Sequence, residues 1–403
     1  MGEANRLDAY APFRFRDYRF LLAGNLLASL GLQMLSVAVS WDLYVKTKSA
    51  LVLGNVGFVQ VAPFLLFALF AGHVADKYDR RLIMVTSQLL LLAAALYLAF
   101  APRSVVSIYS CLFVTAFARS FQGPARLAVL PHVVPMDLLP RAITWNSSAQ
   151  EISSVGGPAL AGLLLASAGS QSVYITQVAC ALAVLFCFSR LRSYGEKDVS
   201  AAPPPPGALL EGVRFVWRNN LIFAAMALDL FAVLFGGATA LLPIYAVEIL
   251  HTGVAGLGWL RAAPSVGAVA MAFLLSHKQK IREAGPALLF AVAGFGIATV
   301  VFGFSRNLPL SLAMLVVTGA CDNISVVLRS SLVQMRTPDY VRGRVNSVNN
   351  IFISSSNQLG AVESGWTAGL FGPVISVAGG GVATVLIAAG FAVIFPSLRR
   401  WRE

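Results

Sequence analysis

Four ionisable residues are expected near the middle of long apolar stretches of the sequence: Arg119, Glu151, Asp229 and Asp322. A charge at mid-membrane depth costs roughly 2.5 to 3.5 kcal/mol on insertion scales, so such side chains face a protein interior or a cavity and have partners. A carboxylate in that setting can take up and release a proton as its contact with an arginine breaks and re-forms. We therefore predict that these four residues take part in proton coupling.

The elements that hold these residues are predicted to be membrane spans. The chain has 403 residues, of which 57% are hydrophobic and only 12% charged, and its mean hydropathy is +0.74. Apolar runs of about 20 residues, enough to cross a hydrocarbon core of roughly 30 Å, recur along the chain. The sequence thus predicts an all-α membrane protein with twelve spans, at 18–43, 51–75, 82–101, 105–129, 142–168, 172–190, 220–248, 254–276, 286–304, 309–333, 345–369 and 373–396.

The basic residues predict the orientation of the chain. Four of them, Lys46, Lys48, Arg103 and Arg306, fall in one set of alternate loops, and most of the other Lys and Arg lie on the opposite side. The basic side is expected to be cytoplasmic, with both termini inside a plasma (inner) membrane. The net charge of +12 then reflects orientation and attraction to anionic lipid, and we expect no nucleic-acid partner.

An internal repeat divides the chain into two halves. A shift of 203 positions places Arg126 on Arg329 and Gly162 on Gly365, and a proline-rich linker lies between the sixth and seventh spans. We predict an N-terminal six-helix bundle at 1–192, a cytoplasmic linker at 193–216 and a C-terminal six-helix bundle at 217–403. Two pseudo-symmetric bundles of this kind form transporters with a substrate site between their halves.

With these spans and this repeat, the chain resembles the major facilitator superfamily over nearly its full length. The loop "GHVADKYDRR" at 72–81 is similar to the superfamily's loop between helices 2 and 3, and "RSFQG" at 119–123 is similar to the helix 4 signature of drug:proton antiporters. "WDLY" at 41–44 and "GGPALAG" at 156–162 look most like the branch that contains the enterobactin exporter and macrolide-efflux proteins.

The resemblance implies a cytoplasmic gate. In the superfamily the loop aspartate, here Asp76, braces the first half against the start of helix 11. The alternative is that the basic residues of this loop only enforce orientation. The gate candidates are Gly72, Asp76, Arg80, Arg81, Arg342 and Arg344.

The repeat makes Arg119 and Asp322 equivalent positions, so we expect both to approach a central cavity. Their contact could load and release a proton, or it could be a static ion pair. Glu151 could instead be a satisfied polar contact, and Arg261 could bind an anionic substrate, neutralise an acid or reach the outer interface. The predicted substrate cavity contains Arg119, Gln122, Asp229, Arg261 and Asp322.

The sequence contains no phosphate-binding loop and no catalytic constellation, so we predict a gradient-driven transporter and not an enzyme. Its four cysteines and four histidines are scattered, and we expect neither a metal site nor a cofactor. The leading prediction is a monomeric, proton-coupled exporter of amphipathic small molecules such as drugs or siderophore-like metabolites. The alternatives are another cargo, such as a lysolipid or a metal ion, or a membrane receptor that does not transport.

The predicted topology can be tested by labelling with a membrane-impermeant maleimide. Because of the basic-residue asymmetry, cysteines introduced at Gly195 and Ser397 should be labelled only from the cytoplasmic side, and one at Lys48 only from outside. Labelling of position 195 from outside would overturn the span count.

Overall fold

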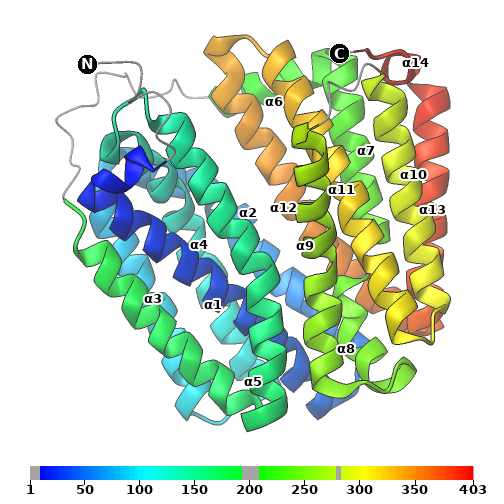
Figure 1. Cartoon of the computed structure of the whole chain (residues 1–403), viewed down its shortest axis with the longest axis horizontal. Coiled ribbons are helices and arrows are strands. Elements are labelled where there is room, and N and C mark those ends of the chain that lie inside the picture. Colours follow the sequence, from blue (N-terminus) through cyan, green and yellow to red (C-terminus); the bar gives the residue numbers. More distant parts are fainter. Residues whose placement is uncertain (1–9, 193–207, 278–282, 403) are drawn as a thin grey trace. The chain divides into compact units, whose positions relative to one another are not determined.

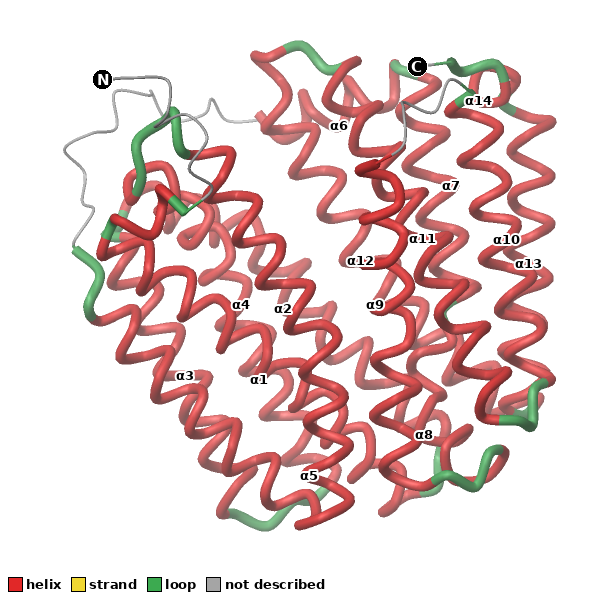
Figure 2. The backbone as a smooth tube through the Cα atoms, viewed as in Figure 1, coloured by secondary structure: helices red, strands yellow, loops and turns green. Residues whose placement is uncertain are grey.

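The structure is a computed structural model that describes residues 10–192, 208–277 and 283–402. Helices make up most of this part of the chain, and no strand occurs in it (Figure 2). The described residues form two compact units. Unit 1 contains residues 10–39 and 62–192, and unit 2 contains residues 40–61, 208–277 and 283–402.

Unit 1 is built from five long helices, and the first two of them, α1 and α2, also contribute residues to unit 2 (Figure 1). They follow the short 3-10 helix η2 (Ala11–Arg14) and are α1 (Arg16–Thr47), α2 (Ala50–Lys77), α3 (Arg80–Phe100), α4 (Val105–Val133) and α5 (Leu139–Ser189). The end of α1, the start of α2 and their connection, residues 40–61, group with unit 2. We call residues 40–61 the hairpin tip.

Unit 2 contains the remaining helices, including two short ones at its ends. They are α6 (Ala208–Arg218), α7 (Asn220–Gly236), η4 (Ala238–Leu241), α8 (Leu242–Ile244), η5 (Tyr245–Ile249), α9 (Gly253–His277), α10 (Ala284–Phe304), α11 (Leu308–Arg336), α12 (Asp339–Phe371), α13 (Pro373–Ile394) and α14 (Pro396–Arg399). Helix α6 begins within the predicted linker at 193–216 and extends two residues beyond it, and residues 193–207 of that linker are outside the described chain.

These helices account for the twelve predicted spans. In the described chain, ten helical segments are long and apolar enough to cross a membrane, with α7 to η5 counted as one. Helix α5 contains non-helical backbone at Gly169 (φ 73°, ψ 178°), which separates the predicted spans 142–168 and 172–190. Helix α12 has 33 residues but many polar side chains, which lower its hydropathy. The prediction of an all-α protein with twelve spans is confirmed.

A ladder of polar side chains joins α1 to the first part of α5 in unit 1. The donors recur at every fourth residue of α1 and the acceptors at every fourth residue of α5, which places each set on one helix face. The pairs are Asn25 to Asn146 at 2.9 Å, Ser29 to Gln150 at 2.7 Å and Gln33 to Ser154 at 3.4 Å. Hydrogen bonds of this kind hold helices together where water is scarce.

Helix α7 is interrupted in the middle of its span. It ends at Gly236 and continues as a 3-10 turn, a short helix and a π-helical turn. Such a break frees backbone carbonyls, which must find other donors inside a membrane. The Ser364 hydroxyl donates to the Gly237 carbonyl at 3.0 Å, and the Thr384 hydroxyl donates to that of Ala232 at 3.2 Å. The seventh span is therefore not the continuous helix expected over 220–248.

The hairpin tip packs closely against α12. A Cβ placed on Gly365 would lie only 2.4 Å from the Cα of Gly54, so both positions need glycine for the two backbones to approach. Polar contacts flank this crossing: Trp366 Nε1 donates to Asn55 Oδ1 at 3.1 Å, and Gln358 Nε2 donates to Gln60 Oε1 at 3.4 Å.

Gly365→Ala should therefore destabilise the protein. The added methyl group meets backbone atoms of Gly54, which cannot rotate away, and overpacking of this kind costs about 1 to 3 kcal/mol. The thermal unfolding midpoint of the purified protein measures the effect. Gly379→Ala is the matched control because no atom lies within 4 Å of its added Cβ. Equal midpoints for the two variants would show that the close approach is unimportant.

Candidate functional site

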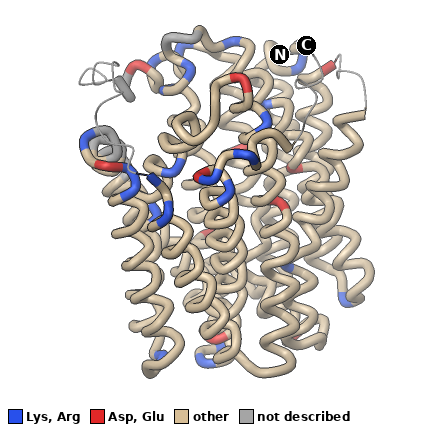
Figure 3. Tube along the Cα trace, turned by 60° about the vertical axis from the view of Figure 1, so that its left-hand side comes forward, with Lys and Arg blue, Asp and Glu red and all other residues tan. Residues whose placement is uncertain are grey.

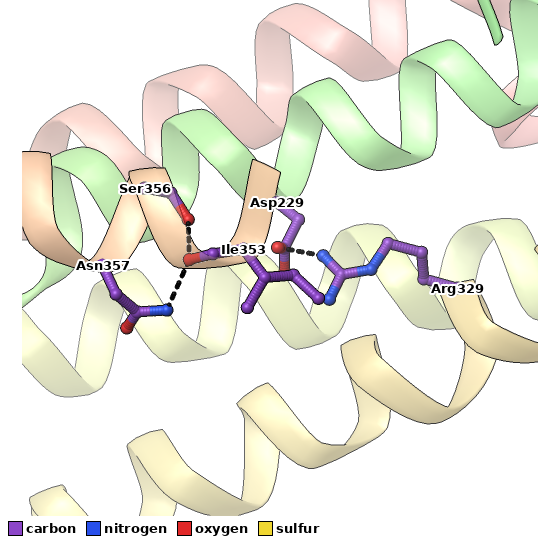
Figure 4. A network of polar contacts seen from close by, with 5 residues as sticks. All are labelled: Asp229, Arg329, Ile353, Ser356 and Asn357. Atoms are coloured by element: carbon purple, nitrogen blue, oxygen red, sulfur yellow. Dashed lines mark hydrogen bonds and ion pairs between the residues drawn. The ribbon is translucent and has the colours of Figure 1, made fainter. Parts of the chain in front are cut away.

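A buried ion pair joins α7 to α11 in unit 2. Figure 4 shows Asp229 and Arg329 pointing toward each other, with Arg329 Nη1 paired to Asp229 Oδ2. Their side chains are only 8% and 2% exposed. The nearby polar groups of α12 are satisfied within their own helix, because Ser356 and Asn357 both donate to the Ile353 carbonyl, at 3.0 and 2.8 Å. In this arrangement Arg329 supplies the counter-charge for Asp229.

Arg329 is a residue whose importance the sequence interpretation missed. The sequence identifies it only as the repeat equivalent of Arg126, and it predicts Asp229 as a proton-coupling acid without indicating its partner. The charges of the two helices could have indicated the pair. The apolar segment of α7 contains one acid, and the span of α11 contains an acid and an arginine, so the arginine is available to neutralise an acid of either helix.

Asp322 lies on α11, two helical turns before Arg329, and is half-buried. No hydrogen bond or ion pair from Asp322 to another described residue of unit 2 is found. Asp229, Asp322 and Ser325 line one small cavity of about 10 Å³, close to the space that a single water needs. The Ser325 hydroxyl is buried and has no protein partner among the described residues. The structure thus brings two of the predicted proton-coupling acids together, and only Asp229 is paired.

In unit 1, α4 presents Arg119 and Gln122 in different environments. Arg119 is exposed and makes no hydrogen bond or ion pair with described residues of that unit. Gln122 is buried, and its Nε2 donates to Gln88 Oε1 at 3.1 Å. Gln88 in turn donates to the Ala181 carbonyl at 3.1 Å. Gln122 therefore links α3, α4 and the second part of α5 in this structure, and the predicted cavity residue is enclosed by protein.

Glu151 lies at a cavity of about 480 Å³ in unit 1. The cavity combines polar side chains with exposed apolar ones, and Arg126 is the cation that shares it with Glu151. Its lining comes from α1, α4 and α5: Leu21, Asn25, Arg126, Leu127, Leu130, Pro131, Leu139, Ile143, Asn146, Ser147, Ala149, Gln150 and Glu151. Ligand pockets of 300 to 1,000 Å³ bind drug-sized molecules.

Arg261 lies on α9, where it contacts the hairpin tip. Its Nη2 donates to the Ser40 hydroxyl at 3.1 Å. In the same region the Tyr44 hydroxyl donates to Glu248, and the Lys48 ammonium lies 4.9 Å from the centre of the Tyr44 ring. The structure thus places Arg261 among contacts between the hairpin tip and the rest of unit 2. Arg261 is not among the residues that line the cavity of Asp229 and Asp322.

The gate candidates of unit 1 are only partly described. Gly72 and Asp76 belong to α2, but the surroundings of Gly72 and the side chain of Asp76 are outside what the structure describes. Arg80 donates to His132 Nε2 at 2.6 Å, and the Arg81 guanidinium donates to the Ser189 carbonyl. Both arginines therefore contact other helices of their own unit.

The gate candidates of unit 2 lie at the start of α12. Arg344 forms an ion pair with Glu211 on α6, and Arg342 donates to the Thr337 carbonyl at 3.4 Å. The amphipathic helix α6 was not expected from the sequence, so the Glu211 contact could not be predicted.

No metal site is found. Among the described residues, no group of three or more His, Cys, Asp or Glu side chains is placed to hold a metal ion. The cysteines Cys111, Cys180, Cys187 and Cys321 are all free.

The buried pair predicts an unequal response to mutation. Arg329→Gln leaves the Asp229 carboxylate buried without its cation and should destabilise the protein by about 3 to 5 kcal/mol. The double variant Asp229→Asn/Arg329→Gln should recover most of that loss, because no unpaired charge remains. Arg344→Gln is the control, since its partly exposed pair with Glu211 should contribute no more than about 1 kcal/mol. Chemical denaturation in detergent measures all three; a double variant no more stable than Arg329→Gln would contradict the coupling.

Comparison with known proteins identifies the family. The chain is 25% identical over 399 residues to the enterobactin exporter EntS of Citrobacter koseri, and the alignment covers 96% of this chain and 93% of that protein. It is 23% identical over 397 residues to the EntS of Shigella boydii serotype 4, with the same coverage.

Solved structures with the same fold are transporters of different kinds. A bacterial homologue of the human lysosomal transporter Spinster, in an inward-facing and unoccupied conformation, superposes with a TM-score of 0.73 at 16% identity, covering 96% of this chain and 98% of that one. A POT family transporter in complex with a thioalcohol-conjugated peptide gives 0.74 at 10% identity, covering 95% and 96%.

The family description "Transmembrane secretion effector" matches residues 7–403, almost the whole chain. This places the chain among transporters and not among enzymes, as its sequence predicted. The chain is a multi-pass membrane protein that belongs to the transmembrane secretion effector family of the major facilitator superfamily.

Proposed function

We propose that this protein is a proton-coupled secondary exporter of amphipathic small molecules in the inner membrane. The observation that carries the proposal is the unequal pairing of two neighbouring acids: Arg329 neutralises Asp229, whereas Asp322 has no counter-charge among the described residues of unit 2. An acid held at this depth without a cation is suited to be neutralised by a proton.

In the proposed cycle, Asp322 carries the proton. Asp229 and Arg329 remain paired and fix the local geometry, and the small cavity beside Ser325 gives room for a water through which the proton moves. Arg119, the repeat equivalent of Asp322, contacts the deprotonated carboxylate in one state of the transporter and releases it in another. Protonation and the change of state are then linked through one carboxylate.

The substrate is proposed to bind first at the unit 1 cavity. Its size suits a drug-sized molecule, and its mixed lining suits one with a polar and an apolar part. Arg126 and Glu151 would contact the polar part, and Leu127 and Ile143 the apolar part. The names of the enterobactin exporters support outward transport and a siderophore-like cargo.

Alternating access requires both ends of the transporter to open and close in turn. We propose that Asp76, with the basic residues Arg80, Arg81, Arg342 and Arg344, closes the cytoplasmic side, and that Gly72 permits the close helix approach there. The contacts of Arg261 and Glu248 with the hairpin tip would close the outer side. One copy of the chain would suffice for this cycle.

The proposed function is tested by flux into proteoliposomes. Purified protein would be reconstituted and assayed with a panel of dyes, macrolides, siderophores and lysolipids, with and without an imposed proton gradient. Gradient-dependent movement of at least one amphipathic compound is expected. Binding without flux for every compound would favour a receptor.

The proton site is tested by substrate-induced proton release between pH 5 and 9. Asp322→Asn should abolish proton release and proton-driven flux while substrate binding stays measurable, because the amide cannot carry a proton. Arg119→Ala should impair both flux and binding, since it removes the proposed partner of the deprotonated acid.

Asp229→Asn and Glu151→Gln are the parallel variants for this measurement. Proton release that persists in Asp322→Asn and disappears in either of these would move the proton site to that residue. Release that persists in all three variants would refute the antiport mechanism.

A further inference from the structure

We infer that unit 2 contains a binding site for the phosphate head group of an anionic phospholipid, separate from the transport pathway. The site is a cavity of about 740 Å³ at the end of unit 2 that carries α6 and the C-terminus. The basic-residue bias predicts that this end faces the cytoplasm. We call it the basic pocket; it is lined by Phe215, Arg218, Asn219, Asn220, Leu221, Arg336, Ser397, Arg400, Trp401 and Arg402.

The charge of the basic pocket is one-sided. Its lining contains four arginines and no acidic residue. Figure 3 shows Lys or Arg close to the C-terminus, whose last residues supply part of this lining. At its edge, Glu283 forms an exposed pair of 3.6 Å with Arg402. Four guanidinium groups around one concave surface repel one another unless an anion lies among them, and guanidinium matches phosphate in geometry.

The backbone adds donors to the same pocket. Helix α7 begins at Asn220, and the first N–H groups of a helix have no partner inside it. The Asn219 side chain accepts from the Ile222 N–H, at 3.2 Å. The positive end of the α7 dipole therefore adds to the field of the arginines.

The C-terminal arginines are held in place by the core. Leu398 and Trp401 are buried in the same hydrophobic cluster as Val216 and Ile222. The Gly285 N–H donates to the Trp401 carbonyl at 3.0 Å, which fixes the segment against the start of α10. Arg400 and Arg402 thus project from an ordered segment, and the basic pocket is a built site.

Apolar surface next to the basic pocket indicates a lipid source for the phosphate. Trp217, beside Arg218, is 65% exposed, and Val393 and Ile394 at the end of α13 are 76% and 68% exposed. Exposed tryptophan is typical of the membrane interface, and exposed aliphatic residues at a helix end contact acyl chains. The arginines suit the phosphate head group of a phospholipid, and the neighbouring apolar surface suits its acyl chains.

Native mass spectrometry of the purified protein tests this site. Wild-type protein should retain phosphatidylglycerol in preference to phosphatidylcholine. Because each arginine near a membrane surface contributes about 1 kcal/mol, Arg218→Gln/Arg336→Gln should bind phosphatidylglycerol about 25-fold more weakly. The control Arg16→Gln/Arg19→Gln removes the same charge from exposed positions of α1 and should bind within about twofold of wild type.

Three results would overturn the inference. The first is equal retention of the two lipids by the wild-type protein, and the second is unchanged binding of phosphatidylglycerol by the glutamine variant. The third is displacement of the lipid by inorganic phosphate at equal concentration, which would indicate a site for free phosphate. If the glutamine variant does not fold, Arg218→Lys/Arg336→Lys replaces it. Lysine binds phosphate as a point charge without the two-pronged contact, so this variant should bind several-fold more weakly.

Discussion

A charge inside a membrane protein must be neutralised by a partner, and this constraint decides the arrangement of unit 2. Asp229 on α7 and Arg329 on α11 neutralise each other as an ion pair, and this pair is buried beside α12. The pair is costly to break and contributes a fixed geometry more than net stability. Because it consumes the arginine of α11, the second acid of that helix, Asp322, is left to be neutralised in another way. The proposed proton site is thus a consequence of the pairing beside it.

Backbone proximity is the second constraint, and it determines how the hairpin tip is held. Gly54 and Gly365 allow two helices to touch at the backbone, and the polar contacts of Asn55, Gln60 and Ser40 surround that crossing. Contacts of this kind are short-range and few, so they can part as a group without exposing a large apolar core. In the cycle proposed here, the closure of the outer side needs that property.

The sequence predicted the fold well because length and hydropathy are sufficient for membrane spans. The twelve spans, the repeat and the family all followed from apolar runs and short motifs, and even the turn at Gly169 fell between two predicted spans. The break in α7 was not predicted, since its residues remain apolar throughout and the missing hydrogen bonds are supplied by Ser364 and Thr384 from distant helices.

Site residues were harder to predict, because the sequence shows that a charge is buried but not which side chain neutralises it. The depth of Asp229 was apparent, yet its partner lies a hundred positions away on another helix. Gln122 belongs to a recognised motif, but its hydrogen bond to Gln88 encloses it in unit 1. Arg261 contacts Ser40, a partner that the sequence did not identify. Each outcome depends on helix packing, which single-sequence patterns do not specify.

The most direct test of the central claim, that Asp322 titrates while Asp229 stays ionised in its pair, is infrared spectroscopy of carboxylic-acid carbonyl bands in the purified protein as pH is varied from 5 to 9. The proposed mechanism predicts a protonated-acid band that disappears as the pH rises and that is absent from Asp322→Asn at every pH. A band that titrates unchanged in Asp322→Asn would contradict it.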